Sequence, residues 1–338
     1  MNLNISALEY VQQVKNGDIT VEDFISKTLE RISKVDEKLH AFLDVNSEAQ
    51  DNAREIDKKI KTGEKTGKCF GMPISIKDNI CIKNSKTTCG SKMLEDFVSP
   101  YDATVIKKLK EQDAIFIGKT NLDEFAMGIT SEFSAFGPSR NPWNAEYVPG
   151  GSSGGSAVSV SALECVASLG SDTGGSVRNP ASFCSTVGYK PTYGLISRYG
   201  LISYANSIEQ IGPITRTVKD LAFMLNLITG IDPHDNTTIH NPEDDYLSEI
   251  DNGIKGKKIG IIKEMMGEGI DSTVRSATED AASKLESLGA ECQEISLDMV
   301  KYSVAAYYTI TATEAGSNLA RYDNIRYGYD FSLEGYEF

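Results

Sequence analysis

Serine and glycine gather in two short clusters, residues 150–156 and residues 170–176. The first reads Gly-Gly-Ser-Ser-Gly-Gly-Ser and the second Gly-Ser-Asp-Thr-Gly-Gly-Ser, with an apolar stretch of helix length between them at 157–169. Glycine lets backbone N–H groups approach a substrate closely, and serine offers a hydroxyl nucleophile. A flexible Gly/Ser linker would have no use for the apolar stretch. The pattern therefore indicates a substrate site.

Two familiar motifs can be read in these clusters, and each lacks a partner that it needs. A G-x-S-x-G elbow with Ser152 as nucleophile requires a strand directly before it and a histidine base. Pro142 and Pro149 lie where that strand should be, and proline is excluded from central strands. Asp172-Thr-Gly could be half of an aspartic protease site, which needs two such carboxylates, but the chain holds one D-[ST]-G motif.

A third interpretation combines the two clusters with a lysine. Residues 72–76 are largely apolar and predict a short buried strand, and Lys77 follows it directly. Burial disfavours a charged ammonium, so it lowers the lysine pKa and allows the neutral amine to act as a base. Lys77 would take a proton from one serine, which would take it from a second. The S-x-x-K spacing of penicillin-binding proteins does not occur in the chain.

Three long motifs in this order resemble the amidase signature family. They are residues 71–79, which contain Lys77, residues 150–156, and residues 170–178. Further similar segments are residues 118–128, 134–138, 190–194 and 210–217. The resemblance implies an α/β fold with a central mixed β-sheet that helices cover on both faces. Within the family, the motifs are similar to those of the A subunits of glutamyl-tRNA(Gln) and aspartyl-tRNA(Asn) amidotransferases.

The resemblance also implies a role for each matching residue. Ser176 would be the nucleophile that forms an acyl-enzyme ester, Ser152 would relay the proton from a cis peptide after Gly151, and Lys77 would be the final base. The oxyanion hole would be formed by the backbone N–H groups of Thr173, Gly174, Gly175 and Ser176. Met127 and Tyr307 would bind the substrate. Ser153 and Asp172 would support the turn.

The activity implied by the resemblance is that of a glutaminase subunit. It would release ammonia from glutamine through a Ser-Ser-Lys triad, and the ammonia would convert misacylated Glu-tRNA(Gln) to Gln-tRNA(Gln). The expected partners are B and C subunits in a heterotrimer. ATP and Mg²⁺ are expected at the partner, with no cofactor or metal in this chain. A stand-alone amidohydrolase of small amides and a truncated, non-catalytic fragment are the alternatives.

Composition sets limits on partners and location. The chain of 338 residues has a formal net charge of −14, so phosphate backbones should repel it and tRNA should be held through the B subunit. We find no run of the roughly 20 apolar residues that would span a membrane, and no basic start followed by an apolar stretch. We therefore expect a cytoplasmic protein. Six cysteines without a C-x-x-C pair predict reduced thiols.

Hydrophobic periodicity predicts the elements that position these residues. Helices are expected from residue 18 to 35 and at 47–61, 104–110, 218–229, 272–288 and 300–322, and strands at 72–76, 114–117, 258–262 and 292–297. The acidic segment 231–253 is expected to be a solvated loop. We predict one domain, 1–338, with a helical segment at 1–65, a catalytic core at 66–230 and a remainder at 254–329. The chain departs from the family pattern near residue 330, so we expect a domain incomplete at its C-terminus.

Overall fold

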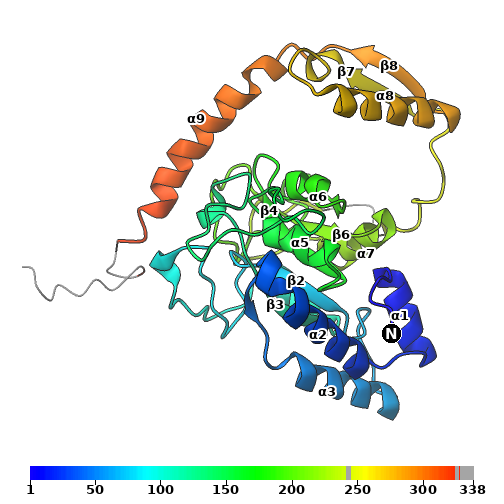
Figure 1. Cartoon of the computed structure of the whole chain (residues 1–338), viewed down its shortest axis with the longest axis vertical. Coiled ribbons are helices and arrows are strands. Elements are labelled where there is room, and N and C mark those ends of the chain that lie inside the picture. The colour runs from blue at the N-terminus through cyan, green and yellow to red at the C-terminus, as the bar shows by residue number, and fades with distance from the viewer. Residues whose placement is uncertain (241–244, 324–326, 328–338) are drawn as a thin grey trace, which may run out of the picture. The chain divides into compact units, whose positions relative to one another are not determined.

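The computed structural model describes residues 1–240, 245–323 and 327 (Figure 1). The chain divides into two compact units, residues 1–246 with 314–338, and residues 247–313. Lys77 and both serine clusters belong to the first unit. The sequence led us to expect one domain that is incomplete at its C-terminus, and this expectation stays a prediction. The expected departure from the family pattern near residue 330 lies outside the described residues.

The first unit alternates helices and strands. Its helices are α1 (Ala7–Asn16), α2 (Val21–Leu39), α3 (Ala49–Thr62), α4 (Thr104–Glu111), α5 (Gly154–Ser161), α6 (Arg178–Phe183) and α7 (Val218–Ile228), with 3-10 turns η1 (Lys92–Leu94) and η2 (Glu124–Ala126). Its strands are β1 (Phe42–Val45), β2 (Pro73–Lys77), β3 (Ile115–Thr120), β4 (Ala167–Asp172), β5 (Val187–Gly188) and β6 (Gln210–Thr215).

These strands form one mixed sheet in the order β1-β3-β2-β4-β6-β5. β2 runs parallel to β3 and β4, whereas β1, β5 and β6 pair antiparallel with their neighbours. Every residue of β2, β3 and β4 is buried, as expected for parallel strands covered on both faces. The predicted α/β fold with a central mixed sheet is confirmed.

The topology brings the candidate residues to one edge of the sheet. β2 and β4 are parallel neighbours, so Lys77 and Asp172, the last residues of these strands, lie at the same edge of the sheet. Helix α5 begins just after Ser152 and packs against β2, β3 and β4. β6 runs the opposite way and starts at this edge, where Gln210 pairs with Asp172. Ligand sites in open α/β sheets lie at such carboxyl ends.

The second unit contains a two-stranded parallel sheet whose strands are connected by a helix. Strands β7 (Lys258–Ile262) and β8 (Glu291–Ile295) pair in register, and α8 (Ser272–Ser287) connects them after the short turn η3 (Lys263–Met265). Helix α9 (Val300–Leu319) has residues in both units. Of the helices in the described ranges, none is long and apolar enough to cross a membrane.

The apolar stretch 157–169 is divided between two elements. Helix α5 ends at Ser161 and strand β4 begins at Ala167, because Leu163 turns the chain in the left-handed region at a φ of 62°. One prediction about a segment is wrong. The acidic segment 231–253, of which 241–244 lie outside the described residues, is not simply solvated. Asp232 and Asp235 are buried, and their carboxylates accept hydrogen bonds from Ser197 and from the Arg198 N–H respectively.

Candidate active site

Lys77 is a fully buried lysine surrounded by hydroxyl groups. Its Nζ donates to Ser152 Oγ at 2.8 Å and to Ser171 Oγ at 3.0 Å. Burial lowers the pKa of Lys77 to about 8, although the nearby carboxyl groups of Glu209 and Asp123 raise this pKa. A substantial fraction of the amine is therefore neutral near pH 8, and a neutral amine 2.8 Å from a hydroxyl can accept its proton.

Ser152 is held in a turn where only glycine fits before it. The Gly151–Ser152 peptide bond is cis, as the family resemblance implied. A Cβ on Gly151 would lie 2.2 Å from Asp123 Oδ2 and 2.8 Å from the Ser131 nitrogen, far inside contact distance. The Gly151 N–H donates to Asn179 Oδ1 at 3.0 Å. These contacts hold the Ser152 backbone beside the Lys77 amine.

Ser153 connects the two serine clusters. Its N–H donates to the Ser176 carbonyl at 3.0 Å, and its Oγ donates to the Ser171 carbonyl at 3.1 Å. Ser176 therefore lies against the turn that carries Ser152. Lys77 and Ser152 are 0% exposed, whereas Ser176 is 6% exposed. Ser176 is therefore the one of these three residues that is not entirely closed off from solvent.

Asp172 organises the turn that carries Ser176. Its carboxylate accepts from the N–H groups of Gly175 at 2.8 Å and Val177 at 3.1 Å, and from Arg178 Nε at 3.0 Å. Burial raises the pKa of Asp172, but the Arg178 guanidinium and the N–H groups outweigh it and leave the pKa below its ordinary value. Asp172 thus stays ionised and fixes the backbone of the second cluster.

The same contact bears on the oxyanion prediction. The Gly175 N–H donates to Asp172 Oδ1 in this structure, so Gly175 could donate to an oxyanion only by sharing or leaving that bond. Gly175 has a φ of 130°, a conformation that only glycine adopts readily. The oxyanion roles of Thr173, Gly174, Gly175 and Ser176 stay predictions.

Known proteins resemble this chain over most of its length. The family model described as Amidase matches residues 23–337. The chain belongs to the amidase family. Among curated members, it is 65% identical over 333 residues to the A subunit of glutamyl-tRNA(Gln) amidotransferase from Cenarchaeum symbiosum, covering 98% of this chain and 69% of that protein. It is 53% identical to the same subunit of Carboxydothermus hydrogenoformans, covering 98% of this chain and 68% of the relative.

Solved amidase-family structures share the fold. The A subunit of glutamyl-tRNA(Gln) amidotransferase from Thermotoga maritima superposes with a TM-score of 0.84 at 45% identity, covering 94% of this chain and 66% of that one. The peptide amidase from Stenotrophomonas maltophilia superposes with a TM-score of 0.87 at 31% identity, covering 95% of this chain and 68% of that one. The chain thus spans about two thirds of the length of these family members.

The two predicted substrate residues of this amidase-family chain lie in different units. Met127 packs against a cluster formed by Cys89, Leu94 and Phe125 in the first unit. Tyr307 is half-buried in the second unit, where its ring meets that of Tyr308 with centroids 5.3 Å apart. The substrate roles of Met127 and Tyr307 stay predictions.

The structure adds polar residues around Lys77 that the sequence reasoning missed. Asn79 Nδ2 donates to Ser171 Oγ at 3.0 Å. The buried Asp123 accepts from the Ser131 N–H at 3.0 Å, and the buried Glu209 acts on the pKa of Lys77. Asn79, Ser171 and Asp123 lie inside segments that resemble the amidase family, and Glu209 directly precedes another. Their position in or next to these segments was the signal that could have indicated a role in the site. The segments alone do not show which strand ends lie together.

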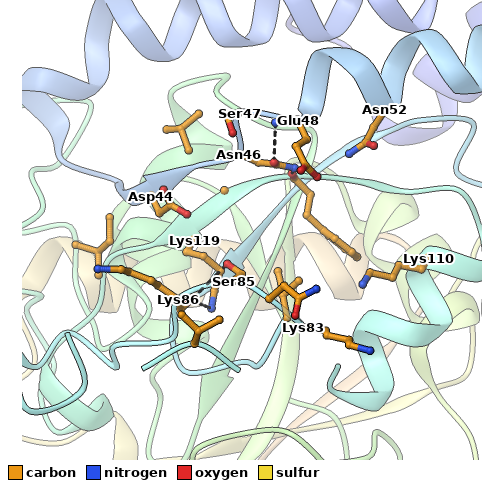
Figure 2. Close-up of a pocket in the computed structure, with 17 residues that line it drawn as sticks. Asp44, Asn46, Ser47, Glu48, Asn52, Lys83, Ser85, Lys86, Lys110 and Lys119 are labelled. Carbon is orange, nitrogen blue, oxygen red and sulfur yellow. Dashed lines mark hydrogen bonds between the residues drawn. The ribbon is translucent and has the colours of Figure 1, made fainter. Parts of the chain in front are cut away.

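A pocket elsewhere in the first unit is lined by none of the candidate active-site residues described above. It has a volume of about 760 Å³ and is lined partly by Lys83, Lys86, Lys110 and Lys119 (Figure 2). Three of these lysines are already paired with carboxylates outside the lining: Lys119 with Asp78 at 2.9 Å, Lys110 with Asp102 at 2.8 Å, and Lys86 with Asp96 at 3.3 Å. We assign no chemistry to this pocket.

Proposed function

We propose that this chain is the glutaminase subunit of a tRNA-dependent amidotransferase and that Lys77, Ser152 and Ser176 carry its reaction. The observation that carries the proposal is the buried Lys77 amine, 2.8 Å from Ser152 Oγ and beside the turn that holds Ser176. Its pKa of about 8 makes it a usable base without a histidine. The relatives, named as A subunits of glutamyl-tRNA(Gln) amidotransferase, supply the substrate class.

In the proposed reaction, protons move along the three side chains. Neutral Lys77 takes the proton of Ser152, and Ser152 takes that of Ser176 as its Oγ attacks the glutamine side-chain amide. The tetrahedral intermediate collapses by breaking the C–N bond, and the nitrogen regains the proton and leaves as ammonia. Water then hydrolyses the Ser176 ester by the same relay, which gives glutamate and restores the three residues.

The remaining steps belong to partners. We propose that B and C subunits complete a cytoplasmic heterotrimer, and that the B subunit binds tRNA, ATP and Mg²⁺ and uses the ammonia to convert Glu-tRNA(Gln) to Gln-tRNA(Gln). The net charge of −14 supports a tRNA contact outside this chain. Ammonia formed at Ser176 would pass to that partner.

Ser176→Ala tests the proposal directly. Glutaminase activity of the full chain, measured with its partner subunits, should fall at least about a thousandfold, as for other lost serine nucleophiles. Ser182→Ala is the matched control, because Ser182 is exposed on the neighbouring helix α6 and should leave turnover unchanged. Unaltered turnover in Ser176→Ala would exclude the assigned nucleophile.

One observation favours a second function, the stand-alone hydrolysis of small amides. The peptide amidase of Stenotrophomonas maltophilia has a TM-score of 0.87 with this chain, although its identity is lower than that of the amidotransferase subunits. Hydrolysis of simple amides by the chain alone, with no gain on adding partner subunits, would favour this alternative. A rate that rises on assembly favours the glutaminase.

A further inference from the structure

Glu209 is a buried acid in the site that the proposed reaction leaves without a role. It is 0% exposed and directly precedes strand β6, whose first residue, Gln210, pairs with Asp172. Its Oε2 accepts from the Tyr204 N–H, while its Oε1 has no hydrogen-bonding partner. A buried carboxylate is costly unless another charge compensates it.

The compensating charge is Lys77. Burial raises the pKa of Glu209, and Lys77 is the first influence that lowers it. Conversely, among the groups that raise the pKa of the buried Lys77, Glu209 comes first, ahead of Asp123, Asp172 and Cys89. The two groups are therefore coupled, so that a proton on one changes the affinity of the other for protons.

The other two acids near Lys77 are occupied. Asp172 binds Arg178 through both carboxylate oxygens, at 3.0 Å and 2.9 Å. Asp123 accepts from the N–H groups of Ser131 at 3.0 Å and Phe133 at 3.2 Å. Glu209 is the acid of the three whose second oxygen is unused.

Ser171 is a hydroxyl that binds the Lys77 amine and also acts on the pKa of Glu209. Its Oγ accepts from Lys77 Nζ at 3.0 Å and from Asn79 Nδ2 at 3.0 Å. Both acceptor positions of the hydroxyl are thereby filled, which leaves its proton for an acceptor. The Ser171 hydroxyl lowers the pKa of Glu209 and so favours its ionised form, and Ser171 pairs with Ile211 on strand β6, which Glu209 directly precedes.

We propose that Glu209 is a positioning residue of the site, whose buried carboxylate, at the start of the strand that pairs with β4, holds a proton on the Lys77 amine after Ser152 has released it. The ammonium formed in the relay is otherwise an unpaired buried charge, and Glu209 offsets that cost. The inference rests on the proposed function for its chemistry, but the coupling of Glu209 and Lys77 can be measured without turnover.

The experiment is an NMR titration of the full chain carrying [13Cε]lysine. The Lys77 signal is assigned by its absence in Lys77→Met. The parent should titrate near pH 8, the pKa of Lys77, and Glu209→Gln should lower that midpoint by about one pH unit, since a neutral amide no longer favours the ammonium. The low-pH limb of kcat/KM for glutamine hydrolysis should move by the same amount, whereas a merely structural role would lower the rate without moving the limb.

Glu164→Gln is the matched control. Glu164 is also 0% exposed, and both of its carboxylate oxygens lack hydrogen bonds, but it is not among the charges that act on the pKa of Lys77. Its substitution should leave the Lys77 midpoint in place. Glu209→Asp, which keeps the charge and shortens the side chain, should shift the midpoint in the same direction by less and serves if Glu209→Gln does not fold.

An unchanged midpoint in a folded Glu209 variant, or an equal shift in Glu164→Gln, overturns the inference. A midpoint that moves in a chain without glutaminase activity supports the coupling and contradicts the proposed function. An active chain whose Lys77 midpoint does not respond to substitution of Glu209 supports the proposed function and contradicts the coupling.

Discussion

At the scale of single residues, the proposed chemistry depends on the charge state of Lys77. A protonated lysine cannot take the proton of Ser152, and a lysine exposed to water would be protonated at neutral pH. Full burial lowers the pKa of Lys77, and the nearby acids keep it from falling further. The balance of these two effects places the pKa at about 8, where the amine can both accept and return a proton.

This pKa predicts the pH dependence of the reaction. The pKa of Lys77 is about 8. Because the neutral amine is the active form, kcat/KM for glutamine should rise about tenfold per pH unit below this pKa and level off above it. The measurement is initial-rate kinetics between about pH 6 and about pH 9.5, with circular dichroism at each pH to show that the fold persists. A flat profile across this interval would mean that Lys77 is not the base.

At the scale of elements, helix α2 takes part of its N-terminal cap from another helix. Thr20, at its N-terminus, accepts from the Asp23 N–H at 3.0 Å. The N–H groups of Val21 and Glu22 instead donate to Asp57, a buried residue of α3, at 3.0 Å and 2.9 Å. The Asp57 carboxylate therefore accepts hydrogen bonds from two N–H groups that have no acceptor within helix α2. Its negative charge also complements the positive end of the helix dipole.

Asp57→Ala should accordingly destabilise the first unit by about 1–3 kcal/mol, since it leaves two N–H groups at a helix end without a partner. Urea denaturation followed by circular dichroism measures the loss. Asp51→Ala is the control, because Asp51 is in the first turn of the same helix, and its side chain is 76% exposed and paired with Arg54. Its effect should stay within about 0.5 kcal/mol, and an equal loss in both variants would refute the role of Asp57.

At the scale of the whole molecule, the two units differ in how much they bury. Strands β2, β3 and β4 of the first unit are buried at every residue. Helix α8 of the second unit has no buried residue, and the strands β7 and β8 are exposed or half-buried throughout. Local stability follows buried apolar contact, and a pair of strands alone is marginal in water.

Amide hydrogen exchange should therefore separate the units. We expect amides of α8 to exchange at least about 100-fold faster than those of α2, because opening α8 exposes little further apolar surface. The two helices make a matched pair, with 16 and 19 residues, and α2 buries five of its side chains. Mass spectrometry of peptides from the full chain reads both rates in one sample. Equal protection of α8 and α2 would contradict the expectation.

Much of the fold could be predicted because the relevant signals are local. The apolar stretch before Lys77 predicted strand β2, and helical spacing predicted α2, α7 and α8. The division of the stretch 157–169 could not be predicted, because an apolar run shared by a buried helix and a buried strand has no periodicity that marks the break at Leu163. The acidic composition of 231–253 likewise does not reveal that Asp232 is buried against Ser197.

The sequence by itself determined the order of the motifs, the presence of Lys77, Ser152 and Ser176, and the family, since residue type and spacing along the chain are enough for each. Only the tertiary structure decided that β2 and β4 end at one edge, that Ser153 ties the two clusters together, and that the buried Glu209 acts on the pKa of Lys77. The physical reason is that charge and hydrogen-bond energies depend on separation in space and on burial. Residues 77 and 209 lie far apart along the chain, and the antiparallel return of β6 beside β4 brings them together.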